Sequence, residues 1–227
     1  MAFSRTSSKS LLGRLTVVVL LALLAYGAQA SDWVLKKNDT ARDLRVYQRA
    51  QSNSQFDGIY AVTVLEGKPA RIEAILTDAS AMPEWLARVT QAKIISRKAD
   101  AAIIYLRYTL PYPFRPRDAV LLSRRIKNKD GMVIEAEAIA EKYPLQKNVV
   151  RMLGAKSRWK VTAVDEHRVK VELWGSGEPG GLIPAVLYNF NLADDAVQTF
   201  RQLRRMALRE KYQRAESSAE QTKQHSN

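Results

Sequence analysis

The chain has 227 residues, no cysteine and a formal net charge of +13. The lack of cysteine excludes a disulfide framework and thiol chemistry, and the length suits a single domain with its own core. The positive charge favours anionic partners such as lipid head groups, lipopolysaccharide phosphates or nucleic acid, although charge spread over a surface also serves solubility alone.

The first 30 residues have the pattern of a secretory signal peptide. Three basic residues precede an eleven-residue apolar run at 15–25, and residues 28–30 read Ala-Gln-Ala, which is typical of a cleavage site. Because that run is too short to cross about 30 Å of hydrocarbon, we expect cleavage between Ala30 and Ser31 and a periplasmic or secreted protein. The mature chain would keep 33 Lys and Arg against 23 Asp and Glu, a net charge of +10.

Residues 31–90 predict three strands followed by two helices. The strands are expected at 32–37, 44–50 and 58–66, where apolar residues recur with period two, and the first helix at 70–76. A second helix is predicted to begin near Ser80, its candidate N-cap, with Trp85, Leu86 and Val89 on its apolar face.

Residues 92–175 return to short strands separated by turns. Their short spacing favours antiparallel neighbours. The predicted strands cover 92–98, 101–110, 117–126, 131–140, 149–164 and 168–175. The pattern therefore predicts an α+β fold in which a curved antiparallel sheet wraps around one helix and tends to enclose a cavity.

A long final helix is predicted from residue 182 to about 213. Its apolar face begins with Ile183, Val186, Leu187 and Phe190. The same face continues through Val197, Phe200, Leu203 and Met206. Asp194-Asp195 mark a kink or a restart. Residues 214–227 are polar and predict a disordered tail, so the expected organisation is a signal peptide at 1–30, one domain at 31–213 and the tail.

The segment 174–189, WGSGEPGGLIPAVLYN, joins the last strand to this helix. Its glycines and Pro184 predict a hinge, so that the helix could act as a lid. Residues 175–180 also match the dinucleotide motif G-x-G-x-x-G, but only 47 residues follow and no second parallel strand is available. We therefore expect no cofactor.

A proline-rich loop, Leu110–Asp118, interrupts the strands. Tyr112 and Phe114 in this loop suit insertion at a lipid interface. The alternative is a packed corner that Arg117 and Asp118 fix by hydrogen bonds, and both descriptions are compatible.

Two arginines, Arg107 and Arg151, lie in otherwise apolar strands. Because an arginine that faces a core is costly unless it is paired, each is a candidate to meet the polar head of a ligand. The alternatives are that these faces are exposed to solvent, or that each arginine pairs with a buried carboxylate.

Catalytic and metal-binding patterns are weak. His167 and His225 have no cluster partners, and no nucleophile elbow or phosphate-binding loop occurs, so no catalytic residue and no metal ligand is assigned. Glu135 and Glu137 share one face of a predicted strand. They could form an acid/base pair, but two solvated side chains on the polar face of a sheet are the more common case.

The ordered set of motifs resembles the START family, the lipid-transfer domains related to the steroidogenic acute regulatory protein. The resemblance runs from about residue 32 to 206, and the proline-rich Arg-Asp loop and the Pro-Gly-Gly-x-Ile-Pro turn are its strongest parts. The matching pieces are Trp33-Val-Leu, Val46-Tyr47, Trp85, Tyr105, Leu-Pro-Tyr-Pro at 110–113, Arg117-Asp118, Val150-Arg151-Met152, Trp159, the turn 179–184 and Asn189.

This resemblance implies a helix-grip fold, with a sheet curled around the C-terminal helix and a tunnel for one lipid whose mouth lies at Leu110–Arg117 and Leu182. From the patterns and the resemblance together, we expect lipid contacts at Trp85, Tyr105, Arg107, Tyr112, Phe114, Arg151, Trp174, Ile183, Leu187 and Phe190. Hinge or structural roles are expected for Arg117, Asp118, Pro179, Gly180, Gly181 and Pro184.

The leading functional hypothesis is a periplasmic protein that binds one phospholipid, fatty acid, or sterol- or hopanoid-like molecule and carries it across or along the envelope. We expect a monomer that contacts anionic head groups transiently and does not bind nucleic acid. The alternatives are a cyclase- or hydrolase-like enzyme, which would need Glu135, Glu137 or Asp57 inside the tunnel, and a non-catalytic interaction module of the envelope.

Overall fold

The computed structural model describes residues 32–129 and 131–224, with side chains through Ser218. The predicted signal peptide and His225 lie outside the described residues. The described elements belong to one unit that begins at Trp33.

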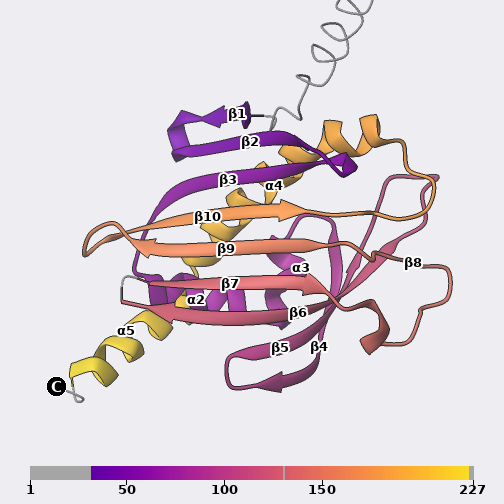
Figure 1. Cartoon of the computed structure of the whole chain (residues 1–227). Coiled ribbons are helices and arrows are strands. Elements are labelled where there is room, and N and C mark those ends of the chain that lie inside the picture. The colour runs from indigo at the N-terminus through magenta and orange to yellow at the C-terminus, as the bar shows by residue number, and fades with distance from the viewer. Residues whose placement is uncertain (1–31, 130, 225–227) are drawn as a thin grey trace, which may run out of the picture. The chain divides into compact units, whose positions relative to one another are not determined.

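A ten-stranded sheet, almost entirely antiparallel, is the main element of this unit (Figure 1). Its spatial order is β1-β2-β3-β10-β9-β7-β6-β5-β4, and the short strand β8 pairs in parallel with β6. The strands are β1 (Val34–Asp39), β2 (Leu44–Gln51), β3 (Ser54–Glu66), β4 (Val89–Lys98), β5 (Ala101–Tyr108), β6 (Arg117–Asn128), β7 (Gly131–Ala138), β8 (Val150–Arg151), β9 (Lys156–Ala163) and β10 (Arg168–Ser176).

Two neighbouring cross-strand rows show how the sequence separates the two faces of the sheet. One row joins Val46, Ala61, Leu173, Trp159 and Ile134, and its side chains are buried or partly buried against the core. The next row joins Tyr47, Tyr60, Trp174, Arg158, Glu135 and Arg124 on the opposite face. Since side chains alternate along a strand, a shift of one residue separates the apolar row from the charged one.

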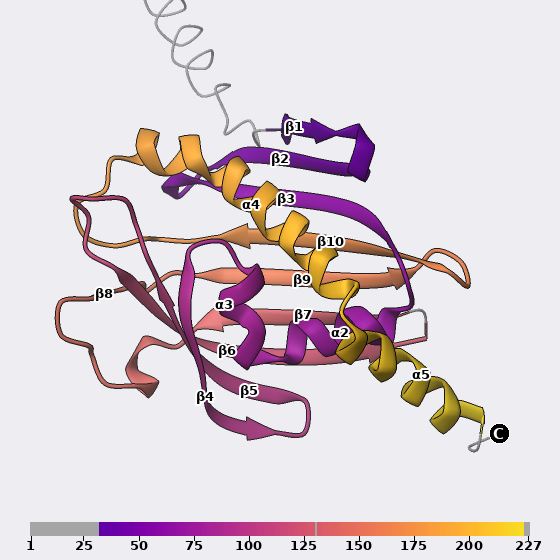
Figure 2. The ribbon, with the colours of Figure 1, turned by 180° about the vertical axis from the view of Figure 1, so that it is seen from behind.

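Of the four α-helices among the described residues, the first three cover the concave face, and the last packs against the first of them beyond the end of the sheet. They are α2 (Pro69–Thr77), α3 (Met82–Trp85), α4 (Ala185–Ala207) and α5 (Glu210–Gln224). Figure 2 shows α4 crossing the sheet obliquely, with α2 and α3 beside it. Phe200, Leu203 and Met206 of α4 are at most 2% exposed and hold its second half against the sheet. Burying each such side chain stabilises the fold by about 1.5–3 kcal/mol.

The predicted α+β class and the helix-grip arrangement, a curved antiparallel sheet with a C-terminal helix, are confirmed. One strand prediction was too long. Residues 149–164 form β8 and β9, with a break at 152–155 where the chain leaves β6 and joins β7.

The prediction of a full second helix from Ser80 was wrong. Ser80 lies in a 3₁₀ turn, and its hydroxyl donates to the Asp78 carboxylate instead of capping a helix. The helix α3 ends at Trp85, Leu86 is extended, and Val89 already begins β4. This early stop turns the chain toward the cavity described below.

The final helix also differs from its prediction. It breaks at 208–209 and not at Asp194-Asp195, and α5 runs through residues expected to form a disordered tail. The reason is docking: the Arg71 guanidinium lies 2.6 Å from Glu216, and the Tyr212 hydroxyl donates to Asp78 over 2.9 Å. Among the described residues, no helix is long and apolar enough to cross a membrane.

The apolar face predicted for the start of α4 was only half right. Val186 and Phe190 are 82% and 77% exposed, whereas Ile183 is buried and Leu187 is partly covered. The side of this part of α4 that lines the cavity carries Tyr188 and Asn191 beside Leu187, which is still 39% exposed. Because apolar residues occur on both sides of this part of the helix, the hydrophobic periodicity could not show which side faces the cavity.

Candidate functional site

A cavity of about 320 Å³ lies between the concave face of the sheet and the first half of α4. Its volume is at the lower end of the range for small-molecule sites, and its walls are mostly apolar, as in such sites. The apolar wall includes Ile59, Leu106, Leu121, Trp159 and Leu173 from the sheet, Leu187 and Leu192 from α4, and Phe114 and Ile183 from the connecting loops.

A smaller chamber of about 70 Å³ continues the cavity toward α3. Leu86, Leu106, Leu121 and Trp159 border both spaces and so form the constriction between them. Trp85 lines the chamber and packs edge-on against Trp159, with ring centroids 5.6 Å apart.

The cavity contains one ion pair and several hydrogen-bonding groups. The Arg88 Nε donates to Asp195 over 2.5 Å, and both side chains line the cavity. Burial raises the pKa of the Asp195 carboxyl, although Arg88 opposes this. Burial also raises the pKa of Tyr188 to about 12 and that of Tyr108, so both phenols are neutral donors near pH 7.

One end of the cavity, here called the loop end, is formed by residues 110–116 and 177–184. Gly180 and Gly181 have φ angles of 65° and 63°, a conformation that L side chains rarely adopt. The buried Arg117 fixes this turn by donating to the carbonyl oxygens of Pro179, over 3.2 Å, and Gly180, over 2.9 Å. The turn is therefore tied to the first residue of β6.

Arg151 and Asp118 form a buried, two-pronged ion pair beside this turn. The Arg151 Nε and Nη2 donate to the two Asp118 oxygens over 2.6 and 3.0 Å. The remaining guanidinium N–H groups donate to the carbonyl oxygens of Ala140, Tyr143 and Pro144. Of the alternatives open for Arg151, pairing with a buried carboxylate is the one observed.

The structure brings only some of the predicted site residues to the cavity. Phe114, Ile183 and Leu187 line it, Trp85 lines the smaller chamber, and Arg117 and Pro179 line its loop end. Pro184 is the N-cap residue of α4.

The other predicted lipid contacts lie elsewhere. Tyr105 is buried against Tyr143, with ring centroids 4.9 Å apart, and Arg107 borders a shallow surface depression with Thr90. Tyr112 and Phe190 are 97% and 77% exposed. Arg151 is paired with Asp118, as described above. Trp174 projects from the opposite face of the sheet, because Leu173, the preceding residue of the same strand, points toward the cavity.

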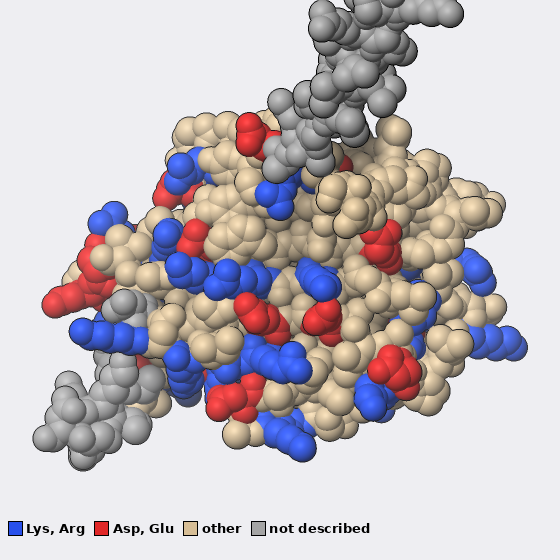
Figure 3. Space-filling view, in the orientation of Figure 1, with Lys and Arg blue, Asp and Glu red and all other residues tan. Residues whose placement is uncertain are grey.

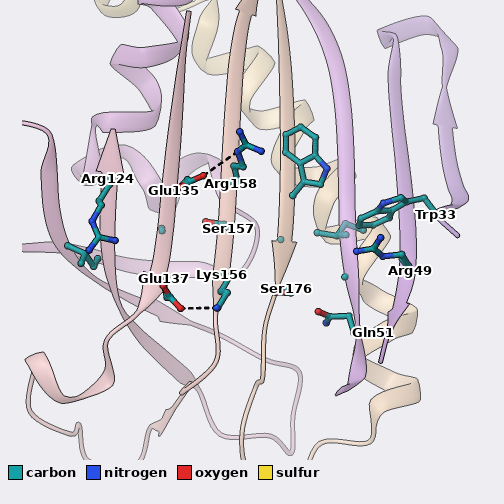
Figure 4. Close-up of a pocket in the computed structure, with 16 residues that line it drawn as sticks. Trp33, Arg49, Gln51, Arg124, Glu135, Glu137, Lys156, Ser157, Arg158 and Ser176 are labelled. Atoms are coloured by element: carbon teal, nitrogen blue, oxygen red, sulfur yellow. Dashed lines mark ion pairs between the residues drawn. The ribbon is translucent and has the colours of Figure 1, made fainter. Parts of the chain in front are cut away.

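A second hollow, on the outer face of the sheet, holds Trp174 and the two glutamates considered for catalysis (Figure 4). Glu137 pairs with Lys156 over 2.8 Å and Glu135 with Arg158 over 3.4 Å. Asp57 accepts a hydrogen bond from Gln48 over 2.7 Å and does not line the cavity. None of these three carboxylates faces the cavity, which was the requirement of the enzyme hypothesis.

Eight polar residues of the cavity were not predicted: Arg88, Tyr108, Lys156, Ser157, Ser176, Tyr188, Asn191 and Asp195. Three of them carried a usable signal, because Tyr188, Asn191 and Asp195 follow one another at helical spacing and mark a polar stripe on α4. Arg88 had no such signal, since its position depends on the unexpected end of α3.

The loop end is surrounded by exposed apolar side chains. Tyr112, Leu182, Val186 and Phe190 are 97%, 96%, 82% and 77% exposed. Figure 3 shows a broad uncharged area over the start of α4 and the preceding loop, whereas Lys and Arg gather in rows across the outer face of the strands. Exposed apolar groups in one place are typical of an interaction surface.

Comparison with known proteins gives a consistent result. A family model described as START domain matches residues 19–213. An uncharacterized protein of Pseudomonas aeruginosa is 28% identical over 199 residues, which cover 86% of this chain and 98% of the relative.

Solved structures share the fold. The crystal structure of a STAR-related lipid transfer protein fragment from Xanthomonas axonopodis superimposes with a TM-score of 0.72 at 26% identity, covering 78% of this chain and 99% of that one. Human StAR-related lipid transfer protein 5 gives a TM-score of 0.69 at 14% identity, covering 88% and 97% of the two chains. The second likeness shows the fold alone.

Proposed function

Since the chain belongs to the START domain family, we propose that it binds one lipid in the cavity beneath α4 and carries it between membranes. The observation that supports this most is the apolar cavity itself, enclosed by the sheet, the first half of α4 and the loop end. The STAR-related lipid transfer protein of Xanthomonas axonopodis, whose structure is similar, supports the same class of ligand.

The physical reason for such a cavity is the cost of moving a lipid through water. Each methylene group that leaves water gains about 0.8 kcal/mol. Moving a free lipid from a membrane into water therefore costs on the order of 10 kcal/mol or more of transfer free energy. An apolar cavity replaces the membrane's surroundings, so extraction becomes nearly neutral and needs no chemical step.

The loop end is the proposed mouth of the cavity. Its exposed apolar side chains, among them Leu182 and Phe190, would enter the membrane, while basic residues contact anionic head groups at about 1 kcal/mol each. Movement of the turn at Gly180 and Gly181 would then lift the start of α4. In this proposal the turn is closed in water by Arg117 and opens at the membrane.

The export pattern of the first 30 residues supports a proposal for the location. We propose that the mature protein works in the periplasm or outside the cell, and moves lipid across or along the envelope.

A cavity-blocking variant tests the proposed function. Leu192→Trp places an indole in the cavity, and Gln198→Trp places the same side chain on the exposed side of α4 as a matched control. We expect the wild type and Gln198→Trp to transfer fluorescent lipid between liposomes, and Leu192→Trp to lose most of this activity while keeping its circular dichroism spectrum. Equal transfer by both variants would show that lipid does not travel in this cavity.

A further inference from the structure

The hollow on the outer face of the sheet is a second candidate site, separate from the cavity beneath α4. Its volume is about 340 Å³, within the range of small-molecule sites. Two indole rings, four cations and two carboxylates are among the groups that line it. Because side chains alternate along β10, Trp174 points into the hollow whereas Leu173 points into the cavity, so the two spaces lie on opposite sides of the sheet.

Small residues and the Trp33 ring shape the floor of this hollow. Arg49 lies opposite Gly58 on the neighbouring strand, and Lys156 lies opposite Ser176. The Trp33 ring lies over Gly58, where an added Cβ would be 3.7 Å from the ring, so the open floor is at Ser176 (Figure 4). Gly58 and Lys156 are two strand spacings apart, about 10 Å. The floor therefore has room for one six-membered ring between the Trp33 ring and the Lys156 side chain.

Neighbouring side chains hold the two indole rings in place. Tyr60 stacks on Trp174, with ring centroids 4.9 Å apart, and the Arg158 guanidinium lies 5.7 Å from the Trp174 centroid. The Arg49 guanidinium lies over the Trp33 ring, 4.5 Å from its centroid. Because these contacts position the rings before a ligand binds, binding costs little further side-chain freedom.

Arg49 keeps its hydrogen-bond donors available beside this floor. In the described part of the chain, no carboxylate lies at ion-pair distance from Arg49, whose contact is the face of the Trp33 ring. Its five N–H donors can therefore bind a phosphate or carboxylate in a two-pronged geometry. Arg124 also has no such partner among the described residues, but it lies on β6, beyond the glutamates of β7 and away from Ser176.

The groups of the hollow favour a ligand with hydroxyl groups and a single negative charge. Glu135 and Glu137 can accept hydrogen bonds from hydroxyls, while Arg49 binds the anion. These glutamates are 52% and 56% exposed, so a bound ligand stays in contact with water and need not be apolar. A nucleic acid strand carries a negative charge at every nucleotide, which the two carboxylates would oppose. A sugar ring instead offers hydroxyls to the carboxylates and C–H groups to the indoles.

We propose that this hollow binds a sugar ring that carries one phosphate or carboxylate group. The anionic group lies on Arg49, and the ring lies over Ser176, between the Trp33 ring and Lys156. The same chemistry occurs in free sugar phosphates and in the phosphorylated saccharide of lipopolysaccharide. The proposal is independent of lipid binding, since the site lies on the opposite side of the sheet from the cavity.

Isothermal titration calorimetry of the full chain tests this proposal with glucose 6-phosphate, glucose and inorganic phosphate. The wild type should bind glucose 6-phosphate at least about tenfold more tightly than either of the others, because it alone combines the ring contacts with the anion contact. Arg49→Gln should lower this affinity about tenfold, toward that for glucose, as the loss of hydrogen bonds to a charged group predicts.

The matched control is Arg45→Gln, the same substitution on the same face of β2. Arg45 is 49% exposed, does not line the hollow and lies four residues from Arg49. That separation is about 13 Å along the strand, beyond the screening length of about 10 Å at 0.1 M salt. The control should therefore leave the affinity for glucose 6-phosphate unchanged.

Vesicles distinguish the two sources of such a sugar. Co-sedimentation compares vesicles that contain lipopolysaccharide with vesicles of equal charge that contain phosphatidylglycerol. Weaker binding of glucose 6-phosphate by Arg49→Gln identifies a free sugar, and a loss confined to lipopolysaccharide vesicles identifies a membrane-bound one.

Three results would overturn the proposal and leave lipid binding in the cavity untouched. The first is inorganic phosphate bound as tightly as glucose 6-phosphate. The second is equal behaviour of Arg49→Gln and Arg45→Gln with both probes. The third is a wild type that binds neither glucose 6-phosphate nor lipopolysaccharide vesicles more tightly than the glucose and phosphatidylglycerol controls.

Discussion

Arg117, Arg151 and Arg88 show that one residue type serves three different purposes around this cavity. Arg117 ties a loop to a strand through backbone carbonyls, and Arg151 neutralises a buried carboxylate. Arg88 pairs with Asp195, the one carboxylate among the described residues that line the cavity. What separates them is the acceptor and its surroundings: backbone carbonyls for Arg117, a fully buried carboxylate for Arg151 and a cavity carboxylate for Arg88.

The Asp118–Arg151 pair gives a direct prediction for stability. Either Asp118→Asn or Arg151→Met leaves a buried group without its partner and should lower the free energy of unfolding by about 3–5 kcal/mol. The double variant Asp118→Asn with Arg151→Met removes both charges and should be less destabilised than the sum of the two single variants. Urea unfolding followed by circular dichroism measures all three, and strictly additive losses would contradict a coupled pair.

At this scale the sequence limits what can be predicted. Arg107 and Arg151 each lie in a similar pattern of apolar residues with period two. Arg107 nevertheless lies at the surface, whereas Arg151 is buried in an ion pair. Asp118 lies opposite Arg107 across β5 and β6 and opposite Arg151 across β6 and β8, but its carboxylate pairs with Arg151. No local pattern contains that pairing, and Arg88 escaped prediction for a similar reason.

At the scale of elements, the turn at 179–184 anchors the first half of α4 to the sheet. Arg117→Met removes the donors to Pro179 and Gly180 and should make lipid exchange faster, because the turn separates from β6 more easily. Lipid stoichiometry should not change. Stopped-flow transfer from labelled liposomes measures the rate, with Arg124→Met on the outer face of the sheet as control. An unchanged rate would place the opening motion elsewhere, for instance at 110–116.

Docking of α5 should depend on pH through Asp78. Burial raises the pKa of this carboxyl, but hydrogen bonds from Lys211, Ser80 and Tyr212 outweigh that effect and hold it at about 2, below the ordinary 3.8. A lowered folded-state pKa means that the contribution to stability is present above about 4 and is lost as pH falls from about 4 to about 2.

Asp78→Asn provides the comparison for this prediction. Hydrogen–deuterium exchange of the α5 amides, corrected for the pH dependence of an unfolded chain, should accelerate in the wild type over that pH window, whereas the variant should already exchange faster near pH 5 and change little below it. A wild-type rate that stays flat between about pH 4 and 2 would contradict the role of Asp78.

Elements were more predictable than their faces. Strands followed from period-two patterns and from the turn signals between them, because these signals are local. The rotation of α4 was not predictable, since Val186 and Phe190 are apolar and exposed for a reason outside the fold, namely the proposed contact with a membrane. The prediction that Ser80 caps a helix failed for a local reason, because its hydroxyl donates to the nearby Asp78 carboxylate.

The whole chain combines a net charge of +13 with an apolar loop end. Binding to vesicles should therefore require anionic lipid and weaken as salt is raised, since charges beyond about 10 Å are screened at 0.1 M. Phe190→Ser with Leu182→Ser should reduce vesicle binding at least about fivefold without altering soluble lipid affinity. Co-sedimentation with vesicles measures this, and equal binding to neutral vesicles at high salt would contradict it.

The central claim, that a lipid occupies the cavity beneath α4, is tested most directly by native mass spectrometry of the mature protein from its own host. The account predicts one bound lipid per chain in the wild type and in Gln198→Trp, and none in Leu192→Trp. A wild type without bound lipid, or lipid retained equally by Leu192→Trp, would contradict the account.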